Sequence, residues 1–256
     1  MILNFAHRGS LTEAPENTLP AMEKAIQHNV KAIELDVQLT KDNHLIVIHD
    51  QNLSRFNRQT QGFIKDYTLE DIKKVDVGSS FSKGYKGVTL ATLEEVLQML
   101  PQDILLNIEI KNKPIVYEGI EDILIECLQQ SNRIDNVLIS SFDHAALETV
   151  QKRVPNIKIG LLLHHRFHKP LEYARKCGMT ITSIHPHVKS TNRKLIANAH
   201  KLGYKVYPYT VNKLKTYNRL MNIGVDGVFS NNPEIFAQSS KTNKNVNQTP
   251  ATAGVR

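Results

Sequence analysis

Short aliphatic runs alternate with helical patterns along most of this 256-residue chain, and this alternation limits the fold more than any other feature. Nine runs have the length and β-branched content of strands, at residues 2–6, 32–37, 45–48, 104–110, 137–141, 157–163, 181–184, 205–209 and 225–229. Helical patterns lie between most of them, for example at 18–28, 92–100, 119–130 and 192–202, and a Thr92–Glu95 capping box marks one helix start. Alternating units predict an α/β protein, and at this length they favour a (β/α)8 TIM barrel over a doubly wound open sheet.

The nine runs exceed by one the eight strands that such a barrel needs, and residues 37–44 explain the difference. So short a connection cannot cross over between parallel strands, but it can join the two arms of an antiparallel hairpin. With Asp42 and Asn43 as a two-residue turn, Asp36 is predicted to lie opposite His49. We therefore expect eight barrel strands and one additional hairpin arm.

Two segments depart from the alternation. Residues 51–90 contain polar loops, several glycines and one short helical stretch at 69–75, which predicts a small insertion after the third strand segment, lying over one end of the barrel. Residues 239–256 are rich in Ser, Thr, Asn, Gln and Lys and are almost free of apolar residues, which is typical of a disordered tail. The expected organisation is one barrel domain at 1–238, including the insertion, and a polar tail.

The positive charge of the chain is weak evidence for a nucleic-acid partner. The formal net charge is +7, but Lys241, Lys244 and Arg256 lie in the tail, which has no acidic residue. The rest of the chain then has 29 basic residues against 25 acidic ones, a net charge of only +4. We therefore predict no nucleic-acid partner, and the composition leaves the oligomeric state open.

Other features indicate a cytoplasmic protein. Cys127 and Cys177 both lie in helical stretches, so they do not imply a disulfide framework. The longest apolar runs are far shorter than the ~18 residues of a membrane span, so no stable membrane insertion is expected. Residues 2–7 have the pattern of a strand and not that of a secretory signal.

Three acidic side chains are predicted to point into the barrel. In the second strand, Glu34 and Asp36 share one face because strand side chains alternate, and in the fourth strand Glu109 has the same placement. Barrel interiors normally pack Val, Ile and Leu at such positions. Carboxylates that converge in a partly buried space repel one another, and either basic side chains or a bound cation must offset that cost. Three inward carboxylates favour a cation, and the lack of a nearby cysteine favours Ca²⁺ or Mg²⁺ over zinc.

Two histidines and two basic residues accompany these carboxylates. His7 ends the first strand and His49 ends the hairpin arm, so both are expected on the side where such barrels place their active sites. Together they are typical of an acid and base pair. Arg8 and Lys111 add positive charge that could neutralise the carboxylates, hold a phosphoryl group, or do both.

These residues fall within a series of motifs that resembles the glycerophosphodiester phosphodiesterase family. The motifs occur in the family's order, and the match runs from about residue 6 to 233. They are His7-Arg8-Gly9, Ala14-Pro15-Glu16-Asn17-Thr18, Glu34-Leu35-Asp36-Val37, His49-Asp50, Thr92-Leu93-Glu94-Glu95, Glu109-Ile110-Lys111, Ser141-Phe142, Thr210-Val211-Asn212 and Gly224-Val225-Asp226-Gly227.

The resemblance implies a (β/α)8 barrel that hydrolyses glycerophosphodiesters to sn-glycerol 3-phosphate and an alcohol with the help of one divalent cation, Ca²⁺ or Mg²⁺. By position, the implied metal ligands are Glu34, Asp36 and Glu109, the implied acid and base are His7 and His49, and the implied phosphate contacts are Arg8 and Lys111. It leaves open which histidine is the acid, and whether water or the substrate's own 2-hydroxyl attacks. The segment 51–90 is similar to the family's small insertion, which helps to cover the glycerol site.

Smaller expectations concern the surroundings of the site. Phe142 and Tyr209 are candidate pocket residues, and Tyr209 stands where the family usually has Trp. Glu16 and Asn17 are predicted to cap the first helix and to brace the loop after His7. The histidine tract at 164–168 follows a strand without acidic partners, so we interpret it as a solvated basic loop and not as a metal site.

Two alternative functions stay open at this stage. One is a lysophospholipase D or phospholipase-type phosphodiesterase that acts on lipids, because aromatic residues of the insertion could form a small apolar rim. The residues concerned are Phe56, Phe63, Tyr67, Phe81 and Tyr85. The other is a catalytically silent barrel that only binds anions.

Overall fold

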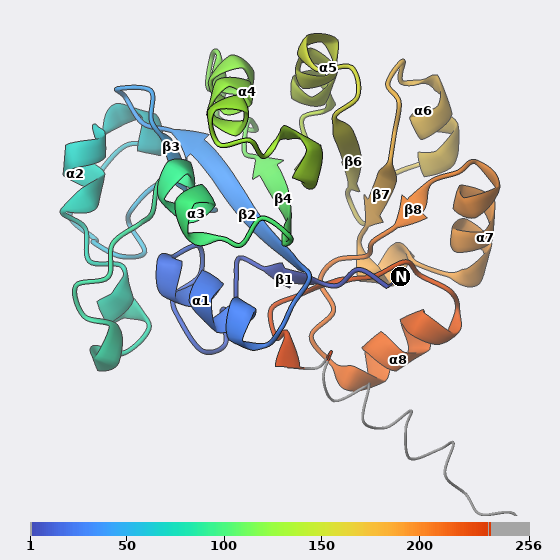
Figure 1. Ribbon diagram of the computed structural model, residues 1–256, viewed down its shortest axis with the longest axis horizontal. Helices are drawn as coiled ribbons and strands as arrows, with labels where there is room; N and C mark the ends of the chain where they lie inside the picture. The colour runs from blue at the N-terminus through green and yellow to red at the C-terminus, as the bar shows by residue number, and fades with distance from the viewer. Residues whose placement is uncertain (1, 235, 237–256) are drawn as a thin grey trace, which may run out of the picture.

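The computed structural model describes residues 2–234 and 236, so the predicted tail at 239–256 lies outside the described residues. Strands and helices alternate along the chain (Figure 1). The strands are β1 (Phe5–His7), β2 (Ala32–Leu39), β3 (Leu45–Val47), β4 (Leu105–Ile110), β5 (Val137–Ser141), β6 (Lys158–Leu163), β7 (Ser183–Pro186), β8 (Lys205–Val206) and β9 (Phe229–Ser230). The α-helices are α1 (Leu19–Gln27), α2 (Leu69–Lys73), α3 (Leu93–Met99), α4 (Ile120–Gln130), α5 (His144–Arg153), α6 (Pro170–Lys176), α7 (Arg193–Lys201) and α8 (Leu214–Asn222). Short 3-10 helices are η1 (Ile64–Asp66), η2 (Gly78–Ser80), η3 (Lys83–Tyr85), η4 (Ile134–Asn136) and η5 (Val188–Ser190).

The strands form one curled sheet. Its order is β8-β7-β6-β5-β4-β2-β1-β9, and every neighbouring pair along this path is parallel. Backbone hydrogen bonds join the two ends, with Phe229 N donating to Pro208 O at 3.0 Å and Val211 N donating to Phe229 O at 2.8 Å. Helices lie on the outside (Figure 1). The predicted (β/α)8 architecture is confirmed.

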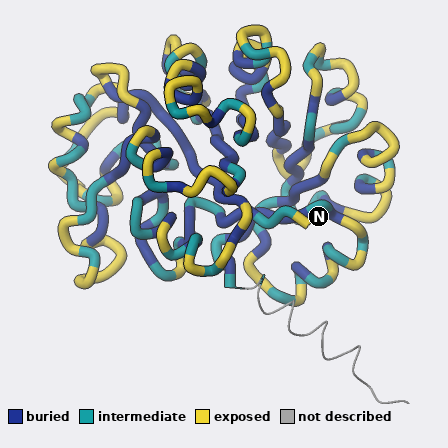
Figure 2. Tube along the Cα trace, in the orientation of Figure 1, coloured by how far each residue is buried: buried dark blue, intermediate teal, exposed yellow. Residues whose placement is uncertain are grey.

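The buried residues separate into an outer and an inner layer because strand side chains alternate. Figure 2 shows the central strands as buried and the outer turns of the helices as exposed. Ile33, Leu35 and Val37 of β2 belong to the apolar layer that packs under the helices. On the opposite face, Phe5 stacks on Phe229 with ring centroids 4.5 Å apart, in a cluster inside the barrel.

The hairpin formed by β2 and β3 has a register that differs by one residue from the predicted one. Val37 pairs with Val47 and Leu39 with Leu45, so Asp36 lies opposite Ile48 and not opposite His49. The predicted two-residue turn was wrong. Thr40 N donates to His44 O at 3.0 Å, which leaves a turn of three residues, and Asn43 adopts a positive φ of 62°. This combination is typical of a three-residue hairpin loop, whose odd length changes the register.

The segment after β3 forms the small insertion that the sequence predicts at this point. It contains η1, α2, η2 and η3, and it encloses an apolar cluster of its own. That cluster contains Ile46, Ile48, Leu53, Ile64, Ile72, Val77 and Leu90. Because Ile46 and Ile48 belong to the hairpin arm, the insertion is packed directly against the segment that leads to His49.

Individual residues determine where several helices and strands begin or end. Thr92 Oγ1 accepts a hydrogen bond from Glu95 N at 3.2 Å and Glu95 Oε2 accepts one from Thr92 N at 2.9 Å, so the predicted capping box is present. The last two strands are shorter than predicted, at two residues each. Pro208 lacks a backbone N–H and therefore cannot extend the ladder of β8.

Candidate active site

A pocket opens at the carboxyl ends of the barrel strands, where TIM barrels place their active sites. Its lining residues are His7, Arg8, Glu34, His49, Asn107, Glu109, Lys111, Ser140, Phe142, Leu162, Tyr209, Thr210 and Phe229. Eight of the nine side chains that the sequence suggested for the site therefore line one pocket. The ninth, Asp36, is fully buried and contacts two of them, Arg8 and Lys111.

The three predicted carboxylates lie together. Asp36 and Glu109 are partners in the parallel pairing of β2 with β4, and Glu34 lies one pleat before Asp36 on the same face. Glu34, Asp36 and Glu109 each offer an oxygen within 4.8 Å of the others, and all three residues are buried. The adjacent parallel strands thus bring together carboxylates that are 75 positions apart in the chain.

Basic side chains balance part of this negative charge. Arg8 Nε lies 3.2 Å from Asp36 Oδ2 and Lys111 Nζ lies 3.0 Å from Asp36 Oδ1, while Lys111 also pairs with Glu109. Burial alone would raise the pKa of Asp36, but the charges of Lys111 and Arg8 outweigh burial and hold it below its ordinary value. Arg8 and Lys111 therefore neutralise part of the charge of the carboxylates, which is one of the two roles that the sequence predicts for them.

This balance is incomplete at Glu34. Burial raises the pKa of Glu34 well above its ordinary value, and the nearby charges of Asp36 and Glu109 raise it further. Among the described residues, Glu34 Oε1 is buried and accepts no hydrogen bond. A buried carboxylate oxygen without a donor is an unfavourable arrangement unless a cation binds there. The donor set consists of oxygens only, so the cluster fits Ca²⁺ or Mg²⁺.

His7 has a defined orientation. Its Nδ1 lies 2.6 Å from Asn231 Oδ1, and because an amide oxygen only accepts, Nδ1 donates this hydrogen bond. Its Nε2 lies 3.8 Å from Glu34 Oε2. Burial lowers the pKa of His7 to about 4, and the positive charge of Arg8 contributes to this decrease. The sequence did not suggest Asn231, because 224 positions separate it from His7.

His49 has a carboxylate as its partner. Its Nδ1 lies 3.1 Å from Asp50 Oδ1, and Arg55 Nε lies 2.8 Å from Asp50 Oδ2. Arg55 also makes a two-point contact with Glu16, whose Oε1 accepts from Arg55 Nη2 at 2.9 Å and from Arg8 Nη1 at 3.0 Å. A continuous set of ion pairs therefore links the His49 loop to Arg8.

The loop after β1 differs in part from its predicted role. The N-cap of α1 is Thr18, and no side chain caps the helix, so the capping role predicted for Glu16 and Asn17 was wrong. Asn17 instead donates from Nδ2 to Asp36 Oδ2 at 2.8 Å. The bracing part of the prediction agrees with the structure, since Asn17 N donates to Arg8 O at 3.0 Å.

Gly9 explains how the chain turns immediately after the His7–Arg8 pair. It has a φ of 81°, and a Cβ at this position would lie 2.6 Å from the carbonyl carbon of Ala21. Any other residue would therefore combine a strained backbone with a collision against α1. The turn lets Arg8 fold back so that its backbone N–H donates to Glu34 Oε2 at 3.0 Å.

The other side of the pocket is aromatic. Phe142 and Tyr209 meet edge to face with ring centroids 6.0 Å apart, and His164 stacks on Phe142 at 4.3 Å. Tyr209 donates from its hydroxyl to Leu163 O at 3.0 Å, and burial raises its pKa to about 12. His164 lies in the exposed loop after β6 and supports a pocket wall, a contact that its sequence context did not indicate.

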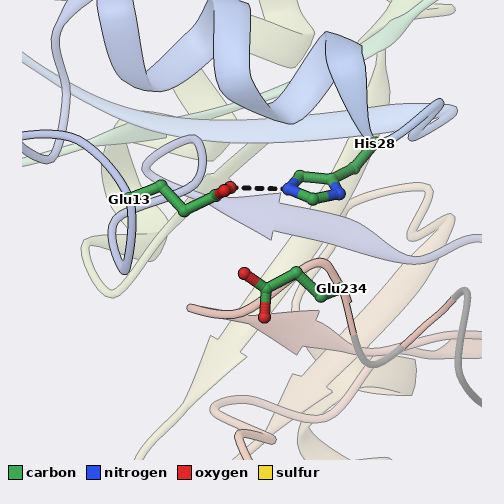
Figure 3. A group of neighbouring side chains, drawn as sticks. All are labelled: Glu13, His28 and Glu234. Atoms are coloured by element: carbon green, nitrogen blue, oxygen red, sulfur yellow. Dashed lines mark hydrogen bonds and ion pairs between the residues drawn. The ribbon is translucent and has the colours of Figure 1, made fainter.

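A second group of metal-type side chains lies outside the pocket. Glu13, His28 and Glu234 come from three separate segments, and Figure 3 shows the His28 ring against Glu13 with Glu234 nearby. His28 Nε2 lies 2.5 Å from Glu13 Oε2, and the same oxygen accepts from Ser10 Oγ at 2.7 Å. An ordinary ion pair at the surface accounts for this contact, and all three residues are partly exposed.

Two further predictions concern the whole chain. Cys127 and Cys177 both carry free thiols, as expected. Within residues 2–234 and 236, no helix is long and apolar enough to span a lipid bilayer.

Comparison with known proteins decides the family. The sequence model of the glycerophosphoryl diester phosphodiesterase family matches residues 7–235. This chain belongs to that family. The resemblance predicted from its motifs is therefore confirmed.

Individual members of the family match over most of their length. A glycerophosphodiester phosphodiesterase of Caldanaerobacter subterraneus subsp. tengcongensis is 41% identical, and the match covers 91% of this chain and 95% of that protein. One from Bacillus altitudinis is 37% identical, with 90% and 94% covered. An Oleispira antarctica phosphodiesterase, solved in complex with the product sn-glycerol-3-phosphate, is 31% identical with a TM-score of 0.83, covering 94% of this chain and 96% of that one.

Proposed function

We propose that this protein hydrolyses glycerophosphodiesters to sn-glycerol 3-phosphate and an alcohol with the help of one divalent cation. Its family membership and its 31% identity to a phosphodiesterase solved with sn-glycerol-3-phosphate support this reaction. One structural observation carries the proposal: two carboxylates, two histidines and two basic side chains line one pocket at the carboxyl end of the barrel, and the third carboxylate, Asp36, lies buried against them. That set matches the needs of phosphoryl chemistry.

Glu34, Asp36 and Glu109 would hold the cation. Their oxygens are close together, and one of them, Glu34 Oε1, is buried without a donor. When bound, a divalent cation supplies positive charge that stabilises the phosphoryl oxygens as negative charge builds on them. Whether that cation is Ca²⁺ or Mg²⁺ is for the experiment below to decide.

Arg8 and Lys111 would bind the phosphoryl oxygens. Both already lie within ion-pair distance of Asp36, at 3.2 Å and 3.0 Å. Asn17, through its hydrogen bond to Asp36, and Glu16, through its ion pair with Arg8, would orient this pair. The side chains would reach the substrate without a large rearrangement, which lowers the entropic cost of binding.

The hydrogen bonds at the two histidines suggest a division of roles. Nδ1 of His7 donates to Asn231, so the neutral ring keeps its lone pair on Nε2, where it can accept the proton of the attacking hydroxyl. Nδ1 of His49 lies 3.1 Å from Asp50 Oδ1, so the carboxylate orients this ring for the complementary role. We therefore assign His7 as the base and His49 as the acid that protonates the leaving alcohol.

The deciding experiment measures release of glycerol 3-phosphate from glycerophosphocholine and glycerophosphoethanolamine. The full chain is assayed as purified, after EDTA, and after Ca²⁺ or Mg²⁺ is restored. We expect release that EDTA abolishes and one of the two metals restores. His200→Ala serves as a control, because this exposed histidine pairs with Asp226 outside the pocket. A folded protein that releases nothing with either metal contradicts the proposal.

A lipid substrate is the second candidate function. Phe63 and Phe81 of the insertion are exposed to 39% and 40%, and Phe81 meets Tyr85 edge to face at 5.4 Å. An aromatic rim of this kind could rest on a lipid surface. Release of choline from lysophosphatidylcholine, faster than from glycerophosphocholine, would favour a lysophospholipase D. The predicted cytoplasmic location and the lack of a nucleic-acid partner stay predictions.

A further inference from the structure

Gln38 is a buried polar side chain that the proposed chemistry does not use. It lies on β2 two residues beyond Asp36, on the same face of the strand, and it is fully buried. Its Nε2 donates to Ile48 O at 2.8 Å, to His49 O at 3.2 Å and to Asp50 O at 2.9 Å. One amide thus binds the carbonyl groups of three consecutive residues, with His49 in the middle.

These three carbonyl groups need a donor because the chain leaves the sheet there. The ladder with β2 ends at Val47, after which Ile48 N makes a last backbone hydrogen bond to Asp36 O at 3.0 Å. The carbonyl groups that follow turn toward Gln38. The bond to Ile48 O is buried and those to His49 O and Asp50 O are partly buried, so leaving these carbonyl groups without a donor is costly and the path of residues 48–50 depends on this amide.

Tyr117 determines which end of the Gln38 amide faces those carbonyl groups. The Tyr117 hydroxyl donates to Gln38 Oε1 at 2.6 Å, and Tyr117 is 3% exposed. An amide with this partner on its oxygen must direct its N–H groups to the other side. Tyr117 is itself held by a hydrogen bond from its backbone N to Asn112 Oδ1 at 2.7 Å. The contacts therefore run from the loop after β4, through Gln38, to the backbone of His49.

We propose that Gln38 is a positioning residue for His49, and that Tyr117 orients Gln38 for this task. The inference rests on the proposed function, because only that function assigns His49 a catalytic role. Asp50 contacts the imidazole ring itself, whereas Gln38 sets where the backbone of His49 lies. Because a misplacement of about 1 Å at a reacting group can reduce a rate by about 10²-fold, a backbone anchor can control turnover without touching substrate.

The test compares Gln38→Met with a variant that also removes a buried donor of hydrogen bonds to backbone carbonyl groups, at a different place in the fold. Arg133 is fully buried and likewise donates to three carbonyl oxygens, those of Leu100, Pro101 and Ile104, which precede the amino end of β4, whereas the pocket lies at its carboxyl end. Arg133→Met should lower the melting temperature and leave kcat and KM unchanged. Gln38→Met should lower kcat at least about 10-fold with little change in KM. Equal kcat in Gln38→Met and wild type overturns the inference.

A double-mutant comparison separates positioning from general destabilisation. If Gln38 acts through His49, adding Gln38→Met to His49→Ala should lower kcat no further than His49→Ala does alone. A further loss equal to that of the single Gln38→Met variant contradicts the inference. If Gln38→Met does not fold, Tyr117→Phe decides, because it removes one hydroxyl and should lower kcat several-fold without a change in KM. An unchanged kcat in folded Tyr117→Phe then overturns the inference.

The proposed function can fail separately. If the wild-type chain releases no glycerol 3-phosphate with either metal, the function is wrong. If the wild type is active and the Gln38 and Tyr117 variants keep its kcat, only the positioning role is wrong.

Discussion

The two sides of the pocket differ in chemistry. The charged side comes from β1, β2, β4 and the hairpin arm, and every long side chain on it takes part in an ion pair or a hydrogen bond. The aromatic side comes from β5, β6 and the segment after β8, where Phe142, Leu162 and Tyr209 contribute mainly shape. The comparison suggests that one side performs the reaction and the other selects the alcohol or the glycerol unit that fits.

Removing a carboxylate should have the largest effect. Asp36→Asn takes away the charge that faces Arg8 and Lys111 and replaces one of the three anionic ligands of the cluster with a neutral amide. We expect glycerol 3-phosphate release to fall on the order of 10³-fold, and calorimetric binding of Ca²⁺ or Mg²⁺ to be lost. Glu13→Gln is the matched control, because that carboxylate lies in the second group outside the pocket. Metal binding by Asp36→Asn with the affinity of the wild type would show that Asp36 is not a metal ligand.

Removing either histidine should have the next largest effect. His7→Ala and His49→Ala are each expected to lower kcat by about 10²-fold or more, with circular dichroism spectra like the wild type. The assigned roles also separate the two variants. A nitrophenol leaving group needs no proton, so a nitrophenyl diester should restore turnover in His49→Ala but not in His7→Ala. Rescue of His7→Ala alone would reverse the assignment.

A third prediction concerns the stability contributed by a buried histidine outside the pocket. Burial lowers the pKa of His185, inside the barrel on β7, to about 3. Below its ordinary pKa of 6.5 the unfolded chain takes up a proton that the folded chain does not. The free energy of unfolding should therefore fall with decreasing pH between 6.5 and 3, by up to about 1.4 kcal/mol per pH unit.

Denaturant unfolding of wild type and His185→Gln at pH 7 and pH 5 checks this expectation. Other histidines titrate in both proteins, so the difference between them isolates residue 185. The variant should lose less stability than the wild type between the two pH values. Parallel losses would mean that His185 takes up a proton in the folded protein.

The smallest effect is expected on the aromatic side. Phe142→Leu removes the edge contact with Tyr209 and the stacking with His164, contacts worth about 0.5–1.5 kcal/mol each. KM should rise roughly 2- to 10-fold, which corresponds to the free energy of about one such contact, while kcat stays close to the wild-type value. Phe63→Leu, at an exposed site on the insertion, provides the control in steady-state assays. A large loss in kcat for Phe142→Leu would contradict the proposal that the charged side performs the reaction and the aromatic side only selects the substrate.

The sequence was informative where a repeating pattern carries the structure. Alternation along β2 and β4 suffices to bring Glu34, Asp36 and Glu109 to one face, because adjacent parallel strands have a regular register. The barrel follows from the same alternation on a larger scale. The fold and the three inward carboxylates could therefore be predicted without coordinates.

Contacts between distant loops could not be predicted in this way. Asn231 meets His7 only after the barrel closes, and Glu16 meets Arg55 only once the insertion has packed against the barrel. Gln38 occupies a strand position where a polar residue has no special meaning until the path of residues 48–50 is known. The hairpin register depended on whether the turn holds two residues or three, a difference that Asp42 and Asn43 suit equally well.

That three-residue turn also has a consequence for how the protein could change. Most exposed loops tolerate an added residue, because the segments on either side keep their places. If the turn kept its three-residue form, one residue more or less between Thr40 and His44 would instead shift the pairing of β3 with β2 and exchange the two faces of the arm. His49 would then leave the pocket while the barrel remained intact. The length of a solvent-exposed turn thus helps to determine whether His49 lies in the active site.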